Sequence, residues 1–331
     1  MKVSTRTGKV TGRPEEVETG IDALPGHNGV AHFSLSRDGH DLVYAKGERY
    51  SNIYRVDPVD STTPPHMEPL TTGASLKWSP VVSPDRKWIA FAAQTKDGSE
   101  LFRVPIAGGR EIQITDGARV WPRTEIAWSP EGHQIAFHSV RAGRGQIWVA
   151  AVSSGEMRGY PSTNPSRGAG HLTWAPASRI AYKIQRRHIR AFDPATGRDE
   201  LLVRDTTNAL FHSPRYSPDG REIAMLRWHL PEGNVLSIIR IAEGTETRLA
   251  TGPMYPHAWS ADGRFVFAQV PFVPRLLRID ARGKKPTKVV FTAPVREMEC
   301  TLDTSRHQES FICMMFDFVS DIWMIENFDR R

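Results

Sequence analysis

Three side chains that could bind a metal ion stand at the same distance from a recurring turn. His32, Glu125 and His171 each lie four residues before a segment related to Ser-Pro-Asp-Gly. Two imidazoles and one carboxylate form a ligand set that divalent metal ions accept. If the turns belong to equivalent elements, these side chains lie at similar depth and predict a metal site. The alternative is that they are ordinary polar side chains that bind water.

A second group combines charges with aromatic rings, and its members precede the same turns by two to six residues. They are Lys77, Arg123, Phe211, Arg215, Tyr255, Glu299 and Asp303. Charged groups with aromatic walls suit a small anionic ligand or an acidic peptide segment. The alternative is a set of internal salt bridges beside core aromatics.

The sequence lacks the short motifs of the common enzyme classes. It contains no Gly-x-Ser-x-Gly, no His-Glu-x-x-His, no phosphate-binding Gly-x4-Gly-Lys-Ser/Thr and no Gly-x-Gly-x-x-Gly. These motifs supply a nucleophile elbow, a zinc site and two kinds of nucleotide site. We therefore expect a non-enzymatic binding module without a cofactor.

The turn recurs along the chain at nearly constant intervals. Its seven copies begin at Ser36, Ser83, Ser129, Ala175, Ser217, Ser260 and Ser305, of which the fourth and the last are degenerate. Successive copies are 47, 46, 46, 42, 43 and 45 residues apart. Proline presets φ in such a turn, the acid accepts hydrogen bonds from nearby amides, and glycine allows positive φ. Each copy therefore predicts a hairpin between two strands.

The period indicates the architecture. Repeats of about 40–45 residues with four strands each are typical of β-propeller blades. Seven copies predict an all-β, seven-bladed β-propeller of four-stranded blades. The first copy is followed by expected strands over Asp41–Ala45 and Asn52–Val56, and the last by Ser310–Met315 and Asp321–Ile325.

Only six copies are followed by a fourth strand, so the ring needs one more strand from elsewhere. Residues 13–20 resemble the outer strand around Met67–Thr71, and we expect them to pair with the C-terminal blade. The predicted organisation is a short leader over residues 1–12 and a single propeller domain over residues 13–331. Closure of this kind joins the chain ends and leaves no open blade edge.

Strand alternation assigns the side chains of each first strand to two faces. The residue before each turn is mostly bulky and apolar, which indicates packing between blades. Residues two and four places before the turn are mostly small or polar, as expected for a narrow channel. The two candidate groups described above would then face this channel. In a propeller, the metal set would suit a lyase or lactonase, which is the alternative function.

The repeat resembles the TolB-like β-propeller family. The resemblance rests on Ser217-Pro218-Asp219-Gly220 followed by Ile223-Ala224-Met225, on Ile147-Trp148-Val149, and on the ending Leu70-Thr71-Thr72-Gly73. The C-terminal Asp321–Phe328 is also similar to the ends of bacterial signalling proteins that carry such a propeller. The resemblance implies a fold and leaves the chemistry open.

The composition and charge of the chain indicate which kinds of partner to expect. The net charge is +6 with 39% apolar residues, and no apolar run or N-terminal signal is visible, so we expect a soluble monomer without membrane insertion. The localisation is either cytoplasmic or that of a detached C-terminal domain of an anchored protein. The basic run Arg186–Arg190 is an isolated solvated patch, so nucleic acid is not expected. Expected partners are a protein, a peptide or a small anionic ligand.

The two cysteines, Cys300 and Cys313, flank the last turn and could approach each other, but we expect buried free thiols.

Overall fold

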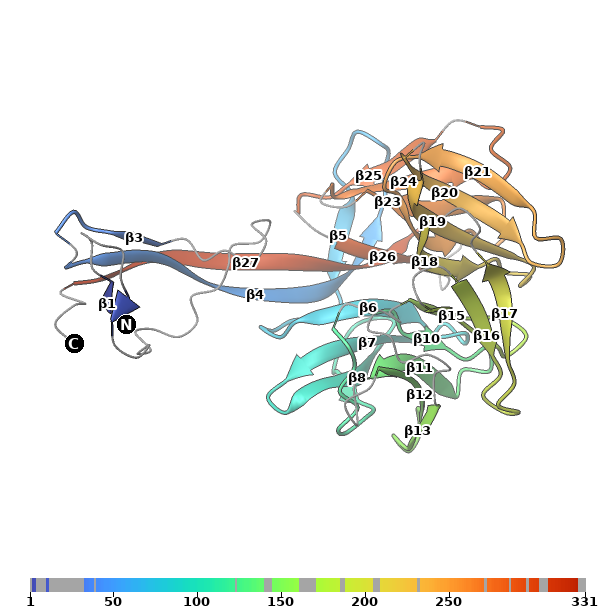
Figure 1. Cartoon of the computed structure of the whole chain (residues 1–331), viewed down its shortest axis with the longest axis horizontal. Helices are drawn as coiled ribbons and strands as arrows, with labels where there is room; N and C mark the ends of the chain where they lie inside the picture. Colours follow the sequence, from blue (N-terminus) through green and yellow to red (C-terminus); the bar gives the residue numbers. More distant parts are fainter. Residues whose placement is uncertain are drawn as a thin grey trace. The chain divides into compact units, whose positions relative to one another are not determined.

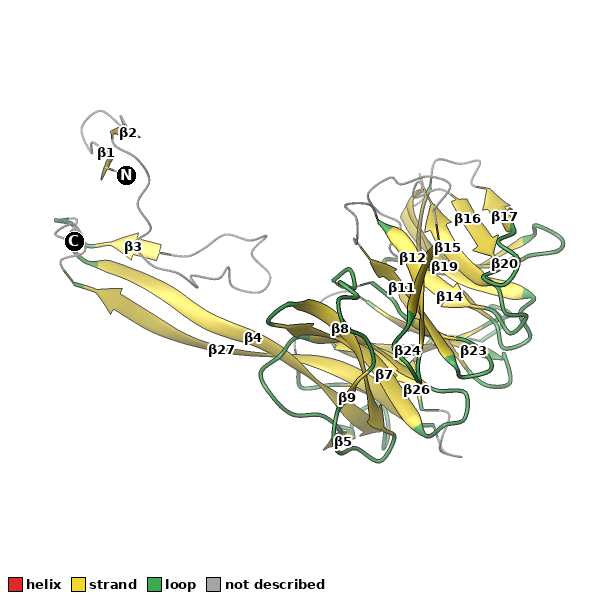
Figure 2. Cartoon of the chain, turned by 90° about the horizontal axis from the view of Figure 1, so that it is seen from below, coloured by secondary structure: helices red, strands yellow, loops and turns green. Residues whose placement is uncertain are grey.

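The computed structural model of the chain contains strands and turns (Figures 1 and 2). It describes residues 2–3, 10–11, 33–38, 40–122, 124–139, 145–160, 171–184, 188–204, 209–230, 233–270, 273–285, 287–295, 298–303 and 309–326. Within these ranges there is no helix, and therefore none that could span a bilayer.

The chain divides into two compact units, residues 50–316 and residues 1–49 with 317–331. In the second unit, β1 (Lys2–Val3) pairs with β2 (Val10–Thr11), and β3 (Phe33–Leu35) pairs with the start of β4 (Leu42–Asp57). The first unit is the propeller and holds every residue discussed below as part of a site.

Six sheets make up the propeller, and five of them are built from four consecutive antiparallel strands. Blade 1 is β6 (Lys77–Val82), β7 (Trp88–Thr95), β8 (Gly98–Pro105) and β9 (Ile112–Gln113). Blade 2 is β10 (Ala127–Trp128), β11 (Gln134–Ser139), β12 (Gln146–Ala151) and β13 (Met157–Tyr160). Blade 3 is β14 (Leu172–Trp174), β15 (Ile180–Ile184), β16 (His188–Phe192) and β17 (Asp199–Arg204).

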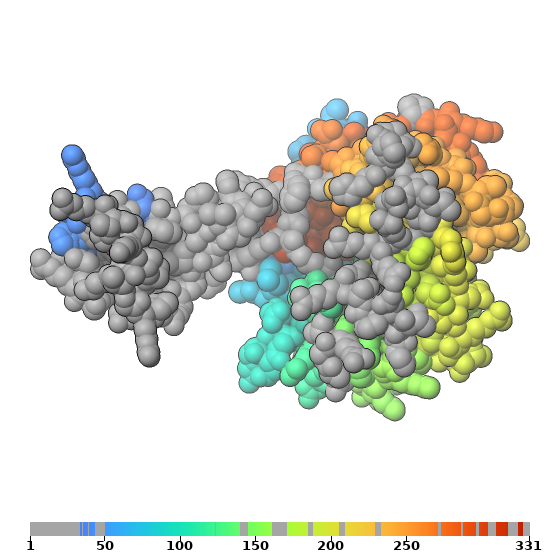
Figure 3. Space-filling model, in the orientation of Figure 1, coloured from blue at the N-terminus to red at the C-terminus, as the bar shows by residue number. Residues whose placement is uncertain are grey.

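Blade 4 is β18 (Leu210–Tyr216), β19 (Glu222–Leu230), β20 (Gly233–Arg240) and β21 (Glu246–Thr251). Blade 5 is β22 (Tyr255–Trp259), β23 (Phe265–Gln269), β24 (Arg275–Asp280) and β25 (Lys288–Thr292). The closing blade contains β26 (Met298–Leu302), β27 (Phe311–Ile325), β4 and β5 (His66–Pro69). The first strands β6, β10, β14, β18, β22 and β26 contact one another in that order and back to β6, so they line the ring. The colours in Figure 3 follow this order around the unit.

The prediction of seven blades is wrong, because the first and last predicted blades share one sheet. Leu42–Asp57 is one continuous strand where two strands and a turn were expected, and Phe311–Ile325 is another. These two strands pair with each other, so each end of the chain supplies half of the closing blade. Phe316–Ser320 contains neither glycine nor proline, the two residues that most strongly interrupt a strand.

The closing strands are also different from those predicted. Strand β27 lies between β26 and β4, and β5 forms the outer edge by pairing with Tyr54–Asp57. Residues 13–20, which were expected to be the outer strand, lie outside the described residues. The predicted mode of closure, in which the chain ends meet by strand pairing, is retained, but β4 and β5 perform it.

Arg55 connects the parts of the closing blade. Its side chain is 6% exposed, and its Nε donates to Asp303 at 3.2 Å, across a separation of 248 residues. Its Nη1 donates to Glu68 at 2.7 Å, and its Nη2 donates to the carbonyl of Ile106 in the neighbouring blade. One buried guanidinium therefore joins β4, β5, the end of β26 and blade 1.

A compact set of hydrogen bonds explains which residues recur in the turn. In blade 4 the Ser217 amide donates to Glu222 O, the Glu222 amide donates to Ser217 Oγ, and this hydroxyl donates to Asp219 at 2.6 Å. Gly220 has φ +71°, and a Cβ there would lie 3.3 Å from the ring of Pro176 in the previous turn. The proline of one turn thus packs against the glycine of the next, which links neighbouring blades.

The bulky residue before the turn also connects blades, as the sequence predicted. The indole nitrogen of Trp128 donates to Val81 O at 3.1 Å, and that of Trp259 donates to Arg215 O at 3.0 Å. Each bond joins the first strand of one blade to that of the preceding blade. Buried apolar side chains fill the spaces between the sheets, for example Phe137, Ile135 and Trp78 between blades 1 and 2.

The expectation of free thiols is wrong. Cys300 and Cys313 are directly opposite residues of β26 and β27, with their Cα atoms 4.0 Å apart, and they form a disulfide. The register of this hairpin, rather than the spacing in sequence, brings the two sulfur atoms together. The bond links the channel-lining strand of the closing blade to its neighbour.

Replacement of Arg55 tests the closure. Arg55→Met should lower the free energy of unfolding by about 3–5 kcal/mol, because it leaves the fully buried Asp303 carboxylate without its cation. Adding Asp303→Asn should recover part of this loss. The exposed Arg264→Met serves as a control and should change stability by about 1 kcal/mol or less. Chemical denaturation measures all three, and a loss for Arg55→Met no larger than the control would contradict the role of this contact.

The disulfide is tested by mass spectrometry. After denaturation without a reductant, iodoacetamide should leave the mass unchanged, because neither sulfur is a free thiol. Reduction before alkylation should add two carbamidomethyl groups. Two additions without reduction would show that Cys300 and Cys313 are unbonded.

Candidate functional site

A cavity of about 660 Å³ lies inside the ring of first strands and is the candidate site. Nearly half of its lining residues lie one or two places before a turn, when the last turn is counted from Asp303. The residues two places before a turn are Val81, Ala127, Thr173, Arg215, Ala258 and Thr301, and the sequence placed all six in the channel. Small side chains at four of these positions keep the channel open.

The mouth of the cavity is apolar and is formed by the turns themselves. Four turn prolines line it, together with four large side chains that precede turns. They are Pro84, Pro130, Pro176 and Pro218, with Trp128, Trp174, Tyr216 and Trp259. Arg86 adds a cation at this exposed rim. Rigid rings therefore surround the entrance, and they can contact a ligand with little loss of side-chain entropy.

Bulges in the first strands shape the floor. The register of β6 shifts between Trp78 and Val81, and that of β18 between His212 and Arg215. Within them, Ser79 and Ser213 have φ 51° and φ 49°, a left-handed conformation that is uncommon outside glycine. Bulges next to functional sites redirect side chains. Here each bulge changes which residues of the strand face the channel.

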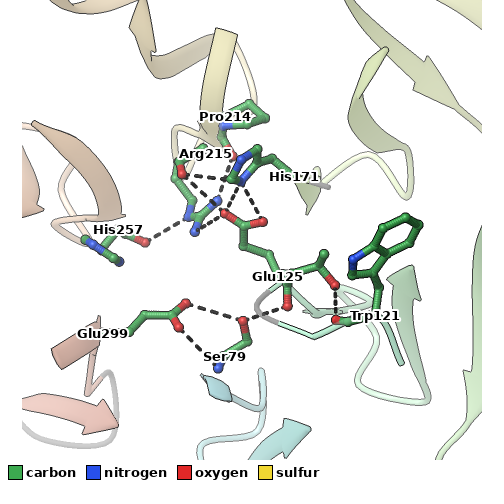
Figure 4. A network of polar contacts seen from close by, with 10 residues as sticks. Ser79, Trp121, Glu125, His171, Pro214, Arg215, His257 and Glu299 are labelled. Carbon is green, nitrogen blue, oxygen red and sulfur yellow. Dashed lines mark hydrogen bonds and ion pairs between the residues drawn. The ribbon is translucent and has the colours of Figure 1, made fainter. Parts of the chain in front are cut away.

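Glu125 is the centre of the polar network on the floor (Figure 4). His171 Nδ1 lies 2.6 and 2.8 Å from its two carboxylate oxygens, and Arg215 Nη2 donates to it at 3.3 Å. Burial alone would raise the pKa of Glu125, but the hydrogen bond from His171 and the charge of Arg215 outweigh burial and lower it. Glu125 is therefore an ionised carboxylate whose charge Arg215 balances.

The Ser213, His171 and Glu125 side chains do not form a hydrolytic triad. Ser213 Oγ lies 3.4 Å from His171 Nδ1, the same nitrogen that bonds to Glu125, and 3.3 Å from the carboxylate. A triad needs one imidazole nitrogen for the carboxylate and the other for the hydroxyl. Since a single nitrogen faces both groups, His171 positions Glu125 and is not placed to activate Ser213.

Glu299 faces the cavity from β26, across the junction between the closing blade and blade 1. The Ser79 amide donates to its Oε2 at 3.3 Å, and Ser79 Oγ lies 3.3 Å from its Oε1. Burial, followed by repulsion from Glu125, raises the pKa of Glu299 to about 7. The Ser79 hydroxyl has one hydrogen, which it can donate to Thr124 O at 2.9 Å, so a protonated Glu299 can donate to the Ser79 oxygen.

The imidazoles near the floor carry no charge at neutral pH. Burial, together with the charge of Arg215, lowers the pKa of His257 to about 3. Burial also lowers the pKa of His138 to about 3 and lowers the pKa of His171. Of the cations that line the cavity, only Arg215 lies at the floor, and its Nε and Nη1 donate to His257 O and Pro214 O at 3.0 Å.

Two of the predicted ligand-binding residues, Arg215 and Glu299, line the cavity together. The bulges turn Lys77 and Phe211 away from it, which corrects their predicted placement. Lys77 is buried and its ammonium donates to Asn52 Oδ1 at 3.2 Å, while Phe211 packs in the core between blades 3 and 4. Lys77 also lies 3.6 Å from Glu111, and these contacts are structural.

The remaining predicted residues lie elsewhere. Asp303 pairs with Arg55, because the last turn begins at Asp303, whose amide donates to Ser310 O as the turn serines do elsewhere. The Tyr255 ring packs against His212 and Trp228, with centroids 5.9 and 6.1 Å away, and does not line the cavity. Arg123 lies outside the described residues.

For the metal set, the structure brings together Glu125 and His171, while His32 lies outside the described residues. Across the described ranges, no three histidine, cysteine, aspartate or glutamate side chains are grouped so that they could bind one metal ion. In this pair, the Nδ1 atom of His171 and the carboxylate of Glu125 are hydrogen-bonded to each other.

His257 was not predicted as a floor residue, and Ser79 and Ser213 were predicted to face the channel but not to form part of a candidate site. A signal was present, because proline follows each of these two serines and precedes His257. Proline inside a strand is typical of a bulge. A third register shift, between Pro256 and Ala258, brings His257 to the cavity although its parity predicted the blade interface.

The sequence matches the TolB beta propeller domain family over residues 26–260. No curated protein sequence shows significant similarity to the chain. Among solved structures, a putative TolB from Agrobacterium tumefaciens is 19% identical with a TM-score of 0.62, covering 82% of this chain and 99% of that one.

TolB from Acinetobacter baumannii is 14% identical with a TM-score of 0.58, and the match covers 72% of this chain. This chain spans 63% of that TolB. An oligogalacturonate lyase from Vibrio parahaemolyticus is 10% identical with a TM-score of 0.50, covering 84% of this chain and 87% of that one. At these identities, the structures share a fold with this chain.

The titration of Glu299 tests the electrostatics of the floor. Its carboxyl should titrate near pH 7, and Glu125→Gln should lower that pKa, because it removes a repelling charge and frees the charge of Arg215. Carbon-13 NMR of labelled glutamate measures this, with Glu299→Gln as the assignment control.

The raised pKa of Glu299 in the folded protein also makes stability depend on pH. The free energy of unfolding of the wild type should fall as pH rises from about 4.5 to about 7, and Glu299→Gln should remove this dependence. A pKa near 4.5 would contradict the description of the floor.

Proposed function

The chain belongs to the TolB β-propeller domain family, and from this premise we propose that it is a binding protein rather than an enzyme. Its ligand is a segment of a partner protein that enters the mouth of the channel. The observation that carries the proposal is the composition of the cavity, an apolar entrance of prolines and indoles above a small polar floor.

The shape and chemistry of the cavity suit a polypeptide segment. Binding sites typically combine apolar walls with a few placed polar groups that fix orientation. The turn prolines provide area for apolar side chains, the indoles add the 7–9% of each residue that is exposed, and the charged floor provides contacts for a polar tip. Proline and aromatic side chains also line the grooves that recognise extended peptides in other proteins.

A small anion is a less suitable ligand than the sequence indicated. Arg215 donates to Glu125 and to two backbone carbonyls, so its donors are largely occupied. Lys77 is buried in contacts with the chain itself. Because these two cations are engaged, Arg86 at the rim is the exposed cation of the described cavity. A single charge at the rim is better suited to contact an acidic residue of a peptide than to form a dedicated anion site.

The floor also favours binding over catalysis. The Ser213 hydroxyl faces the nitrogen of His171 that already bonds to Glu125, and no described cluster offers three metal ligands. The likeness to an oligogalacturonate lyase is one of fold, and fold alone does not assign chemistry. We further propose that the protein acts as a monomer and that its partner is a protein rather than a nucleic acid or a membrane.

Blocking the channel tests this proposal. Peptides of twelve random residues, selected by display on the wild-type protein, are measured by calorimetry on two tryptophan variants. Ala258→Trp fills the channel wall, and Ala107→Trp adds the same side chain to an exposed turn. We expect at least tenfold weaker binding to Ala258→Trp and unchanged binding to Ala107→Trp.

Thermal unfolding establishes that both variants fold, and Thr173→Trp provides a second block from blade 3. Equal affinity for the blocked and control variants would place the binding site outside the channel. Failure to enrich any peptide would likewise reject the mouth as a peptide site. Either result would overturn the proposed function.

A further inference from the structure

The floor of the cavity has one more anionic group than it has cations. Glu125 and Glu299 both line it, and Arg215 is the cation at that depth. Arg215 pairs with Glu125 at 3.3 Å. In the described part of the chain, neither a lysine nor an arginine lies within ion-pair distance of Glu299, whose polar contacts are both with Ser79.

The groups facing Glu299 compensate its charge only in part when it ionises, because Arg215 is paired with Glu125. Blade 1 contributes Ser79, the segment before β10 contributes Glu125, and β18 contributes Arg215. His257 from β22 is neutral, and so is His171 beside Glu125. On the closing blade itself, the adjacent Cys300 is in a disulfide and does not titrate. An ionised Glu299 is therefore a largely uncompensated charge on a half-buried floor, and a cation that arrives there stabilises it.

We propose that Glu299 anchors a primary ammonium group at the tip of the inserted segment, either the N-terminal amine or a lysine side chain. This inference rests on the proposed function and names the chemistry that the floor recognises. The apolar mouth holds the body of the segment, and the ammonium group donates to the Glu299 carboxylate. Charge-assisted bonds of this kind are about twice as strong as neutral ones.

The same geometry makes binding depend on pH. The ammonium group requires ionised Glu299, while an unliganded Glu299 holds a proton near neutrality. Binding to a lysine ammonium group therefore releases a proton, and the apparent affinity should fall about tenfold between pH 8 and pH 6. For an N-terminal amine the fall should be smaller, because the amine itself loses its proton at about pH 8. A ligand without a cation should show no such dependence on Glu299.

Three probes that share a phenylethyl group and differ in its polar end separate charge from apolar contact. They are 2-phenylethylamine, 2-phenylethanol and 3-phenylpropionate, and calorimetry measures their dissociation constants at pH 8. We expect the amine to bind at least tenfold more tightly than the alcohol, and the carboxylate to bind most weakly. Glu299→Gln, which keeps the shape, should remove the preference for the amine, while the exposed Glu243→Gln should keep it.

The peptides selected on the wild-type protein identify the source of the ammonium group. Each is synthesised with a free and an acetylated N terminus, and with each lysine replaced by glutamine. Loss of affinity on acetylation identifies the N-terminal amine, and loss on a lysine replacement identifies that side chain. In both cases the loss should be absent in Glu299→Gln.

The outcomes distinguish this inference from the proposed function. If peptides bind in a manner that Ala258→Trp abolishes, but neither acetylation nor lysine replacement weakens them, the inference fails and the proposed function stands. Absence of amine preference among the three probes, or a preference that survives Glu299→Gln, also overturns the inference. If no peptide depends on the channel, the proposed function fails by its own test.

Discussion

Pairing between the two ends of the propeller chain is the constraint on which the other features depend. Strands β4 and β27 lie side by side in one sheet, and this pairing turns five consecutive blades and two half-blades into a ring. The buried Arg55–Asp303 contact fixes the same junction. The ring brings Glu299 from one end of the chain against Ser79, 220 residues earlier. The candidate site is therefore a product of closure and has no local counterpart in sequence.

Within the closed ring, local irregularity determines the chemistry of the floor. Regular alternation would have directed Lys77 and Phe211 into the channel, and the bulges at Ser79 and Ser213 direct them into the protein instead. The floor then holds two carboxylates in different environments. Arg215 and His171 surround Glu125, whereas Glu299 has only the amide and hydroxyl of Ser79. Their pKa values are consequently displaced in opposite directions.

The fold was largely predictable because the Ser-Pro-Asp-Gly turn is determined by local chemistry. Ser217 and Asp219 form their hydrogen bonds within six residues, so the repeat is visible in sequence. The number of blades was not, because it depends on whether Leu42–Asp57 and Phe311–Ile325 are continuous strands and on their pairing with each other. Arg215 and Glu299 were found because periodicity holds at the channel wall. Asp303 and Lys77 were misplaced because a longer last turn and a bulge change the count, although the proline after Ser79 indicated the bulge.

A crystal structure of the protein with a peptide selected by display would locate the binding site. We expect the peptide to lie between Trp128, Trp174 and Trp259 and to direct its terminal or lysine ammonium group to the Glu299 carboxylate. A peptide bound along an outer strand such as β13 or β17, with the channel unchanged, would contradict this expectation.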